Sequence, residues 1–293
     1  MRRESASRFL LLAPALAILA VFQLYPIVYA FIISFKAFNF LDPSAAHWVG
    51  LGNYVSLFTH GSFRRAVLNT LLLLVTVVPL QTIIGLVIAL LLNSRLRAQG
   101  LYRTLFFLPY VTPPVAVAAI LAYLFTLNGP ATLALVHTLH LPNVPWYATA
   151  PYAIILVGLT TVWMQAGFYM VLYLAGLQDI PNELYEAARV DGATTSQATR
   201  FITLPMLNPT TFLVIVMGII ATLQVFDVPY MISGLGGGVP GGPANSTLTM
   251  VMYLYREAFT NFNMGHASAA AFVVFIGIFA FTLVQRQLFR DRT

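Results

Sequence analysis

Six apolar runs dominate this sequence, and each is long enough to cross a lipid bilayer as a helix. The hydrocarbon core of a bilayer is about 30 Å thick, so a helix needs about 20 residues to span it. The runs are expected to be helical, because an unclosed strand would leave backbone N–H and C=O groups without partners in lipid. The six runs are 9–35, 66–92, 104–127, 151–177, 209–232 and 267–285.

The composition also indicates a membrane-embedded chain. Charged residues make up 8% of the sequence and apolar residues 59%, whereas soluble domains carry about 25% charged residues. A surface this poor in charge must mostly face lipid. The expected fold class is therefore an all-α membrane protein with six transmembrane helices.

Several function classes are disfavoured by the residues that the chain lacks. The absence of cysteine excludes disulfides and thiolate chemistry. The five histidines fall in loops without a third ligand nearby, so no metal site is predicted. No nucleophile–base pair or paired carboxylates are visible, and no catalytic residue is predicted. The single lysine, Lys36, follows Phe35 instead of a Walker glycine, so any ATP must bind another polypeptide.

The distribution of basic residues predicts the orientation of the spans. Eleven of the fifteen lysines and arginines lie in the termini and in the loops 93–103 and 178–208. Basic loops stay in the cytoplasm, so both termini are expected to be cytoplasmic. Clusters at the ends of spans also argue against nucleic-acid binding. The first run, 9–35, is too long for the apolar region of a signal peptide and is expected to remain as a span.

The segment 178–209 predicts two short helices on the cytoplasmic side. Pro181 suits a first helical turn, and Gly192 suits the position that closes a helix. Thr194, Thr195 or Ser196 is expected to cap a second helix, which should end near Leu204 because Pro205 follows. Small and apolar side chains gather on one side of the first helix. This is typical of a helix that docks into a partner's groove.

This segment resembles the EAA signature of binding-protein-dependent ABC permeases. The matching residues are Glu186-Ala187-Ala188, Asp191-Gly192-Ala193, Ile202, Leu204-Pro205 and Pro209. Other stretches narrow the resemblance to the carbohydrate-uptake branch, of the maltose and multiple-sugar type, over nearly the whole chain. They are Tyr25-Pro26, Val49–Tyr54, Leu108-Pro109, Phe226-Asp227, Gly241-Gly242-Pro243 and Ala267-Ser268-Ala269.

The resemblance implies the type I importer transmembrane fold, with the EAA loop as a cytoplasmic coupling helix. It implies a single permease domain over 1–293, with a core at about 64–287 and an N-terminal span at about 9–35. The implied function is a non-catalytic permease subunit, in the bacterial inner membrane, that imports a di- or oligosaccharide. The docking element for the ATPase would comprise Glu186, Ala187, Ala188, Asp191 and Gly192.

The same resemblance implies several partners. They are a second homologous permease in a heterodimer, two ATP-binding cassette subunits and an extracytoplasmic substrate-binding protein. No cofactor is expected on this chain, because ATP and Mg²⁺ would bind the partner subunits.

Polar and aromatic residues inside the spans are the candidates for the substrate pathway. Asp227 is costly in a span. It suits either a sugar-hydroxyl acceptor or a structural pair or cap at a helix end, and the sequence leaves both open. Trp163 and Gln165 lie about 200° apart around a helix, so at most one of them lines the path. The full candidate set is Gln81, Trp163, Gln165, Gln224, Phe226 and Asp227.

Two other functions remain as alternatives. The first is import of glycerol 3-phosphate or a related phosphodiester by the same machinery, although the spans contain no interior basic residue for a phosphate. An ion-coupled secondary transporter belongs to a different class and would need interrupted helices and buried midplane carboxylates. The sequence predicts neither feature.

Overall fold

The computed structural model describes residues 12–59, 61–93, 98–235 and 240–290. The arginines near the N-terminus, Arg95, Arg97, Arg292 and residues 236–239 of the glycine-rich stretch lie outside the described residues. The chain divides into two compact units, residues 1–64 with 253–275 and residues 65–252 with 276–293. Helices α4 (Gly61–Leu92), α14 (Met250–Tyr255) and α15 (Met264–Arg290) each run from one unit into the other.

The first unit is built around the N-terminal helix and the start of α15. Asn53 holds the end of the N-terminal helix, because its amide nitrogen donates to the carbonyl oxygens of Ser34 and Lys36, both at 2.8 Å. The helix Leu12–Ser34 contains a π-turn and packs little against the rest of the chain, since 6% of an apolar 18-residue stretch within it is buried. The elements of this unit are η1 (Ala20–Leu24), α2 (Tyr25–Ser34), β1 (Lys36–Ala37), η2 (Pro43–Ala45), β2 (His47–Trp48), α3 (Gly52–Thr59) and η6 (Arg256–Thr260). Strands β1 and β2 pair antiparallel, with Lys36 opposite Trp48.

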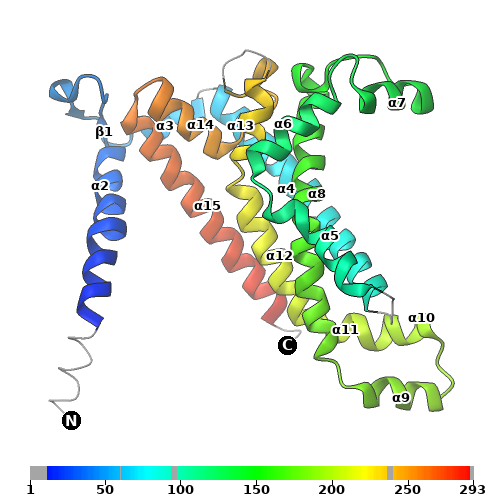
Figure 1. Ribbon diagram of the computed structural model, residues 1–293. Coiled ribbons are helices and arrows are strands. Elements are labelled where there is room, and N and C mark those ends of the chain that lie inside the picture. The colour runs from blue at the N-terminus through cyan, green and yellow to red at the C-terminus, as the bar shows by residue number, and fades with distance from the viewer. Residues whose placement is uncertain (1–11, 60, 94–97, 236–239, 291–293) are drawn as a thin grey trace, which may run out of the picture. The chain divides into compact units, whose positions relative to one another are not determined.

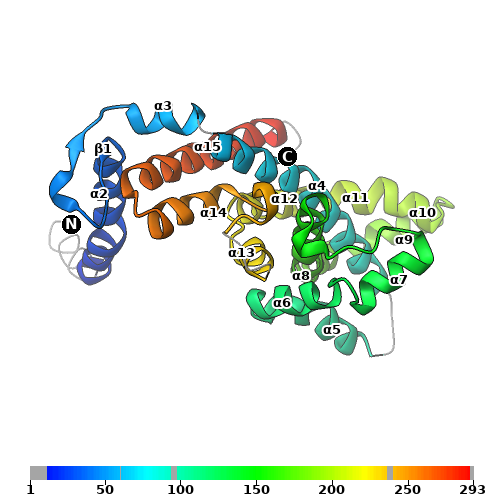
Figure 2. The ribbon, with the colours of Figure 1, turned by 90° about the horizontal axis from the view of Figure 1, so that it is seen from above.

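The second unit is organised around one central helix, α8 (Ala150–Gln178). It packs against α5, α6, α12 and α13 (Figures 1 and 2), and 61% of an apolar 18-residue stretch within it is buried. The other elements of this unit are α5 (Gln99–Val111), α6 (Pro114–Leu124), α7 (Pro130–Leu139), η3 (Trp146–Ala148), α9 (Asn182–Val190), α10 (Thr195–Ala198), η4 (Thr199–Thr203), α11 (Leu204–Met206), α12 (Asn208–Leu223), α13 (Asp227–Gly234) and η5 (Pro243–Asn245).

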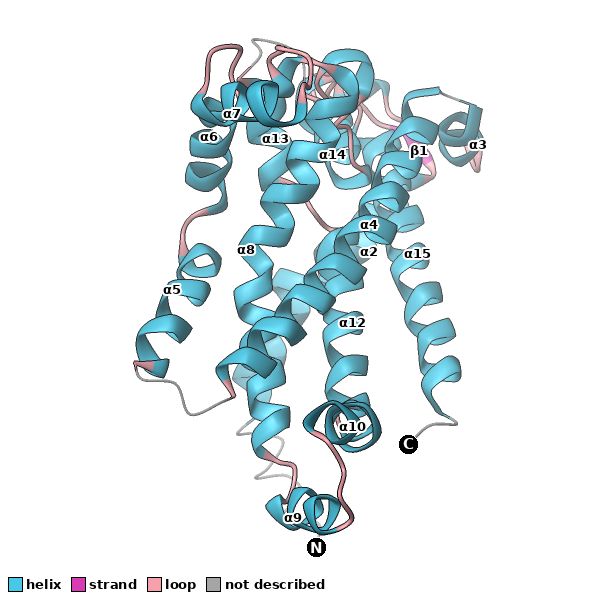
Figure 3. Cartoon of the chain, turned by 90° about the vertical axis from the view of Figure 1, so that its right-hand side faces the viewer, coloured by secondary structure: helices cyan, strands magenta, loops and turns pink. Residues whose placement is uncertain are grey.

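Helices long and apolar enough to span a membrane number five among the described residues, or six with one bent pair. The bent pair is the predicted third span, 104–127. Instead of one helix it forms α5 and α6, which meet at 95° (Figure 3). Pro113 and Pro114 explain the bend, because Thr112 before them is extended, at φ −77° and ψ 139°. The all-α fold class is confirmed.

The predicted fifth span, 209–232, is also interrupted. Helix α12 ends at Leu223 and α13 begins at Asp227, so three residues between them are not helical. Pro229 lies in the first turn of α13, where its ring would clash with the carbonyl of Val225 in a continuous helix. That carbonyl instead accepts a hydrogen bond from Thr249 Oγ1 at 3.0 Å. The expectation that the spans contain no interrupted helix is therefore wrong.

Candidate functional site

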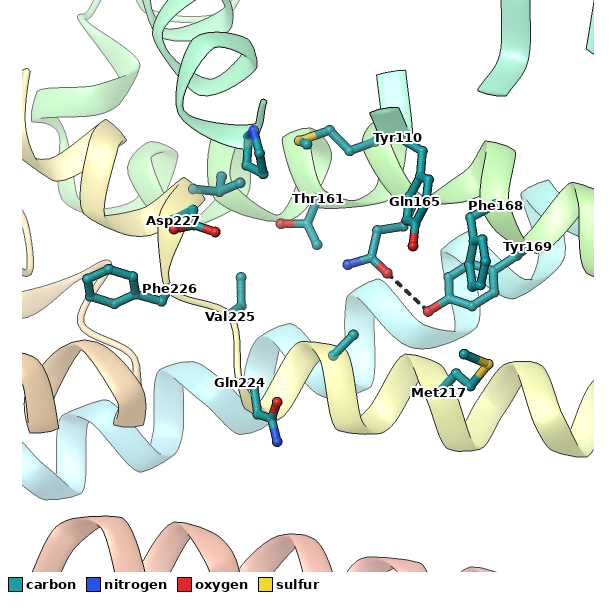
Figure 4. Close-up of a pocket in the computed structure, with 14 residues that line it drawn as sticks. Tyr110, Thr161, Gln165, Phe168, Tyr169, Met217, Gln224, Val225, Phe226 and Asp227 are labelled. Atoms are coloured by element: carbon teal, nitrogen blue, oxygen red, sulfur yellow. Dashed lines mark hydrogen bonds between the residues drawn. The ribbon is translucent and has the colours of Figure 1, made fainter. Parts of the chain in front are cut away.

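A pocket of about 330 Å³ lies at this interruption, within the second unit. Its volume is at the lower end of the range for ligand pockets, about 300–1,000 Å³. Side chains from α5, α6, α8, α12 and α13 converge on it (Figure 4). Its lining residues are Tyr110, Pro114, Thr161, Met164, Gln165, Phe168, Tyr169, Met217, Ala221, Gln224, Val225, Phe226, Asp227 and Val228.

Aromatic rings form one end of the pocket. Tyr110 of α5 stacks on Phe168 of α8, with ring centroids 4.7 Å apart and planes at 12°. Tyr169 donates its hydroxyl to Gln165 Oε1 at 3.0 Å. Because this bond holds the amide oxygen, the amide nitrogen of Gln165 is turned toward the pocket (Figure 4). The pocket therefore presents ring surfaces beside a fixed hydrogen-bond donor.

The interrupted segment supplies the acceptors at the other end. Gln224 and Asp227 are both exposed at the pocket. Asp227 is the first residue of α13, where a carboxylate is favoured by the helix dipole. The structure assigns Asp227 no ion pair and no side-chain hydrogen bond within the described chain. Its carboxylate therefore combines a place at a helix end with freedom to accept hydrogen bonds in the pocket.

Four of the six predicted pathway residues line this pocket: Gln165, Gln224, Phe226 and Asp227. Gln81 does not, because it is fully buried in α4 with its amide nitrogen against Gly218 of α12. Trp163 lies on another face of α8 and lines a separate apolar groove with residues of α4 and α5. This agrees with the expectation that Trp163 and Gln165 point apart. It assigns Gln165 to the pocket.

The predicted docking segment forms α9, which lies with α10 at the end of the unit opposite α6 (Figures 1 and 3). No residue of α9 is buried, and Val190 is 89% exposed. Gly192 ends the helix with φ at +79°. Its N–H donates to Arg189 O at 3.1 Å, and the N–H of Ala193 donates to Ala188 O at 2.8 Å. These two bonds make a Schellman motif, as the sequence position of Gly192 predicts.

The second short helix begins as expected and ends differently. Thr194 forms a capping box with Gln197. The helix does not stop before Pro205. It passes through the π-turn η4 into α11, and Leu204 N–H donates to Thr199 O, five residues back. The wider π-turn accommodates a proline that a regular helix would exclude. Helical structure therefore continues from Thr195 to Met206, and Leu207 alone separates it from α12.

A second, wholly polar pocket of about 300 Å³ lies in the first unit. Glu257 Oε2 lies 3.6 Å from His266 Nδ1, and Asn261 donates to Glu257 Oε1 at 3.0 Å. Burial alone would raise the pKa of the Glu257 carboxyl, but the contacts with His266 and Asn261 lower it below its ordinary value. Among the described residues, no three His, Cys, Asp or Glu side chains lie close enough to hold a metal ion.

The sequence did not predict the aromatic wall of this pocket. Phe168 and Tyr169 occupy ordinary apolar positions of α8, and Tyr110 lies in the last turn of α5, just before the bend. Only the bend at Pro113 and Pro114 brings α5 and α6 around this side of α8. The double proline was the available signal.

The sequence comparisons show the family. Residues 81–293 match the family described as "Binding-protein-dependent transport system inner membrane component". The lactose transport system permease protein of Rhizobium radiobacter is 33% identical, over 99% of this chain and 96% of that protein. The sn-glycerol-3-phosphate transport system permease protein of Yersinia pestis bv. Antiqua is 31% identical, over 94% of this chain and 92% of that protein.

A solved structure has the same fold. It is a bacterial ABC transporter involved in the import of the acidic polysaccharide alginate. One of its chains matches with a TM-score of 0.83 and 23% identity, over 99% of this chain and 96% of that chain. Together these matches confirm the resemblance carried by the EAA segment and the type I importer fold. This multi-pass chain belongs to the family of binding-protein-dependent transport system inner membrane components.

Proposed function

We propose that the chain is the permease subunit of an ATP-driven importer for a di- or oligosaccharide, which an extracytoplasmic binding protein delivers. The observation that carries the proposal is the pocket at the α12–α13 break. Stacked aromatic rings present apolar surface for sugar rings, while the Gln165 amide, the Gln224 amide and the Asp227 carboxylate hydrogen-bond to hydroxyl groups.

The charge of the pocket favours a neutral sugar over glycerol 3-phosphate. None of the fourteen lining residues is a lysine or arginine, and Asp227 adds a negative charge. Phosphate recognition normally uses charge-assisted bonds from arginine or lysine. An anion entering this pocket would meet a carboxylate without a compensating cation, so glycerol 3-phosphate is the second choice.

The exposed α9 supports coupling to ATPase subunits that carry ATP and Mg²⁺. Glu186, Ala187, Ala188, Asp191 and Gly192 form the docking element. The full assembly then comprises this chain, a homologous permease, two ATP-binding cassette subunits and the binding protein. Hydrolysis occurs on the cassettes, and this chain acts as a non-catalytic membrane subunit. Both of its termini, with α9, face the cytoplasm.

The interrupted helix invites comparison with an ion-coupled carrier, which uses broken helices and buried carboxylates at its binding sites. An ion-coupled carrier, however, has no use for an exposed docking helix. The two functions differ in energy source. Uptake driven by ATP, and unaffected when ion gradients are collapsed, supports the importer; uptake that stops with the gradient and ignores ATP overturns it.

The test is ATPase stimulation in the reconstituted assembly, across neutral di- and oligosaccharides and glycerol phosphates, each with its loaded binding protein. We expect stimulation by a neutral sugar. Asp227→Ala should weaken it more than Asp227→Asn, which keeps an acceptor oxygen. Stimulation by glycerol phosphates alone would replace the proposed substrate. If no sugar stimulates an assembled complex, the sugar assignment is refuted.

A further inference from the structure

An aromatic side chain of the docking helix α9 contacts the body of the unit. Tyr185 and Ala188 are the half-buried residues of α9, and Tyr185 packs against the core cluster containing Ile180 and Leu207. Its hydroxyl lies 2.9 Å from Thr203 Oγ1. Within α9, all of which is described, no other side chain makes a hydrogen bond outside the helix. The contact therefore links the exposed helix α9 to a buried residue of η4.

Thr203 connects this contact to the helical segment that follows α9. Thr203 is 4% exposed, and its hydroxyl also lies 3.5 Å from Ala198 O, five residues back. A hydroxyl can both donate and accept a hydrogen bond, and either hydroxyl can be the donor in the 2.9 Å contact between Tyr185 and Thr203. The tyrosine hydroxyl therefore contacts a buried threonine of the π-turn.

The π-turn leads directly to the pathway pocket. Helices α10, η4 and α11 follow one another without a gap, and only Leu207 separates α11 from α12. Leu207 and Thr211 keep helical hydrogen bonds across this junction, at 3.0 and 2.8 Å. Met217, Ala221 and Gln224 of α12 line the pocket. A displacement of α9 that is held at Thr203 therefore moves a helix that forms the pocket wall.

We infer that the Tyr185–Thr203 hydrogen bond is the positioning contact that transmits movement of α9 to α12. The inference rests on the proposed coupling to ATPase subunits and specifies how this chain performs it. Tyr185 and Thr203 are positioning residues, since neither lines the pocket and neither belongs to the docking set. Removing the bond should separate docking from movement of the pocket.

The test uses the absence of cysteine from the chain. Met217→Cys places one thiol on the pocket wall, in the full complex with cysteine-free partner subunits. The ATP-induced change in its labelling rate by a small maleimide reports movement of α12 without any sugar. Binding of the ATPase subunits is measured in the same preparations. Tyr185→Phe keeps the ring and removes the hydroxyl, while Thr203→Val keeps the shape of the side chain and removes its hydroxyl.

Each variant should reduce the ATP-induced change in labelling rate about five-fold. The lost hydrogen bond contributes about 1 kcal/mol, and about 1.4 kcal/mol corresponds to a factor of ten. The double variant should lose no more than either single one, because both remove the same bond. Thr203→Ser should restore the change. Thr199→Val is the matched control, because its hydroxyl bonds only to Thr195 O within the same turn. ATPase binding should stay unchanged throughout.

Additive losses in the double variant, or a full ATP-induced change in Tyr185→Phe, overturn the inference. Equal loss in Thr199→Val also overturns it, because the π-turn itself would then be responsible. Sugar transport is measured in the complex that keeps Met217; if that complex responds to ATP but transports no sugar, the proposed substrate is refuted and the labelling readouts stay intact. A parent complex that binds no ATPase subunit refutes the coupling function and this inference with it.

Discussion

Replacing Gly192 tests whether the end of α9 is fixed by its backbone. The added Cβ would meet no atom within 4 Å, so steric crowding inside the chain contributes nothing. The cost comes from φ at +79°, which an L-residue adopts at a penalty of about 1–2 kcal/mol. Gly192→Ala should therefore weaken binding of the ATPase subunit by about 5- to 30-fold. Gly192→Val should weaken it further, because branched residues are the poorest at positive φ.

Two further variants separate the backbone from the side chain. Gly192→Asn should stay close to wild type, since asparagine tolerates the left-handed region. Gly192→Pro should be the most damaging, because it also loses the N–H that donates to Arg189 O. The assay is titration of purified ATPase subunit onto the permease pair in nanodiscs. Circular dichroism on the same samples checks that the spans stay folded. The backbone argument is refuted if Gly192→Ala binds the ATPase subunit as tightly as wild type does. It is also refuted if Gly192→Asn and Gly192→Val weaken that binding equally.

Three other predictions concern packing, the pocket and pH. Gly167→Ala should lower the thermal stability of the complex by about 1–3 kcal/mol, since its Cβ would overlap a backbone carbonyl of α5. Gly158→Ala, with its nearest neighbour at 3.6 Å, should not. Gln165→Ala should reduce sugar-stimulated ATPase activity up to about ten-fold through a lost hydrogen bond, whereas Trp163→Ala on the other face should leave it unchanged. The folded-state pKa of Glu257 lies below its ordinary value of 4.5, so its carboxylate stabilises the fold above that pH and loses this effect as the pH falls through the folded pKa. The melting-temperature gap between wild type and Glu257→Gln should accordingly narrow below pH 4.5; a gap that stays constant with pH would contradict the assignment.

The spans and the end of α9 were predictable from sequence because they depend on local chemistry. Apolar length determines where a helix crosses lipid, and Gly192 alone satisfies the positive φ at its position. The helix breaks were missed because a count of apolar residues does not register backbone geometry. Pro229 interrupts its span, whereas Pro205 is accommodated in a π-turn. Whether the helix breaks or continues at a proline depends on which other group donates a hydrogen bond to the nearby backbone carbonyl.

Polar residues of the pocket at the α12–α13 break were predictable from sequence, and its aromatic wall was not. Asp227, Gln224 and Gln165 stand out in sequence, because polar groups are costly in a span. Tyr110 and Phe168 do not stand out, since aromatic residues are common in apolar helices. Gln81 is equally polar, yet the packing of α4 against α12 buries it beside the pocket. Only the arrangement of the helices distinguishes a residue that faces substrate from one that faces another helix.

The break between α12 and α13 has a consequence for the energetics of transport. The first N–H groups of α13 have no partner inside that helix, and in hydrocarbon each such group would cost several kcal/mol. At this break Pro229 has no N–H, and the N–H of Tyr230 donates to Phe226 O at 3.0 Å. The cost therefore concerns the N–H groups of Asp227 and Val228, which line the pocket. A hydrated pocket at this break would remove that cost, because water can accept from both groups.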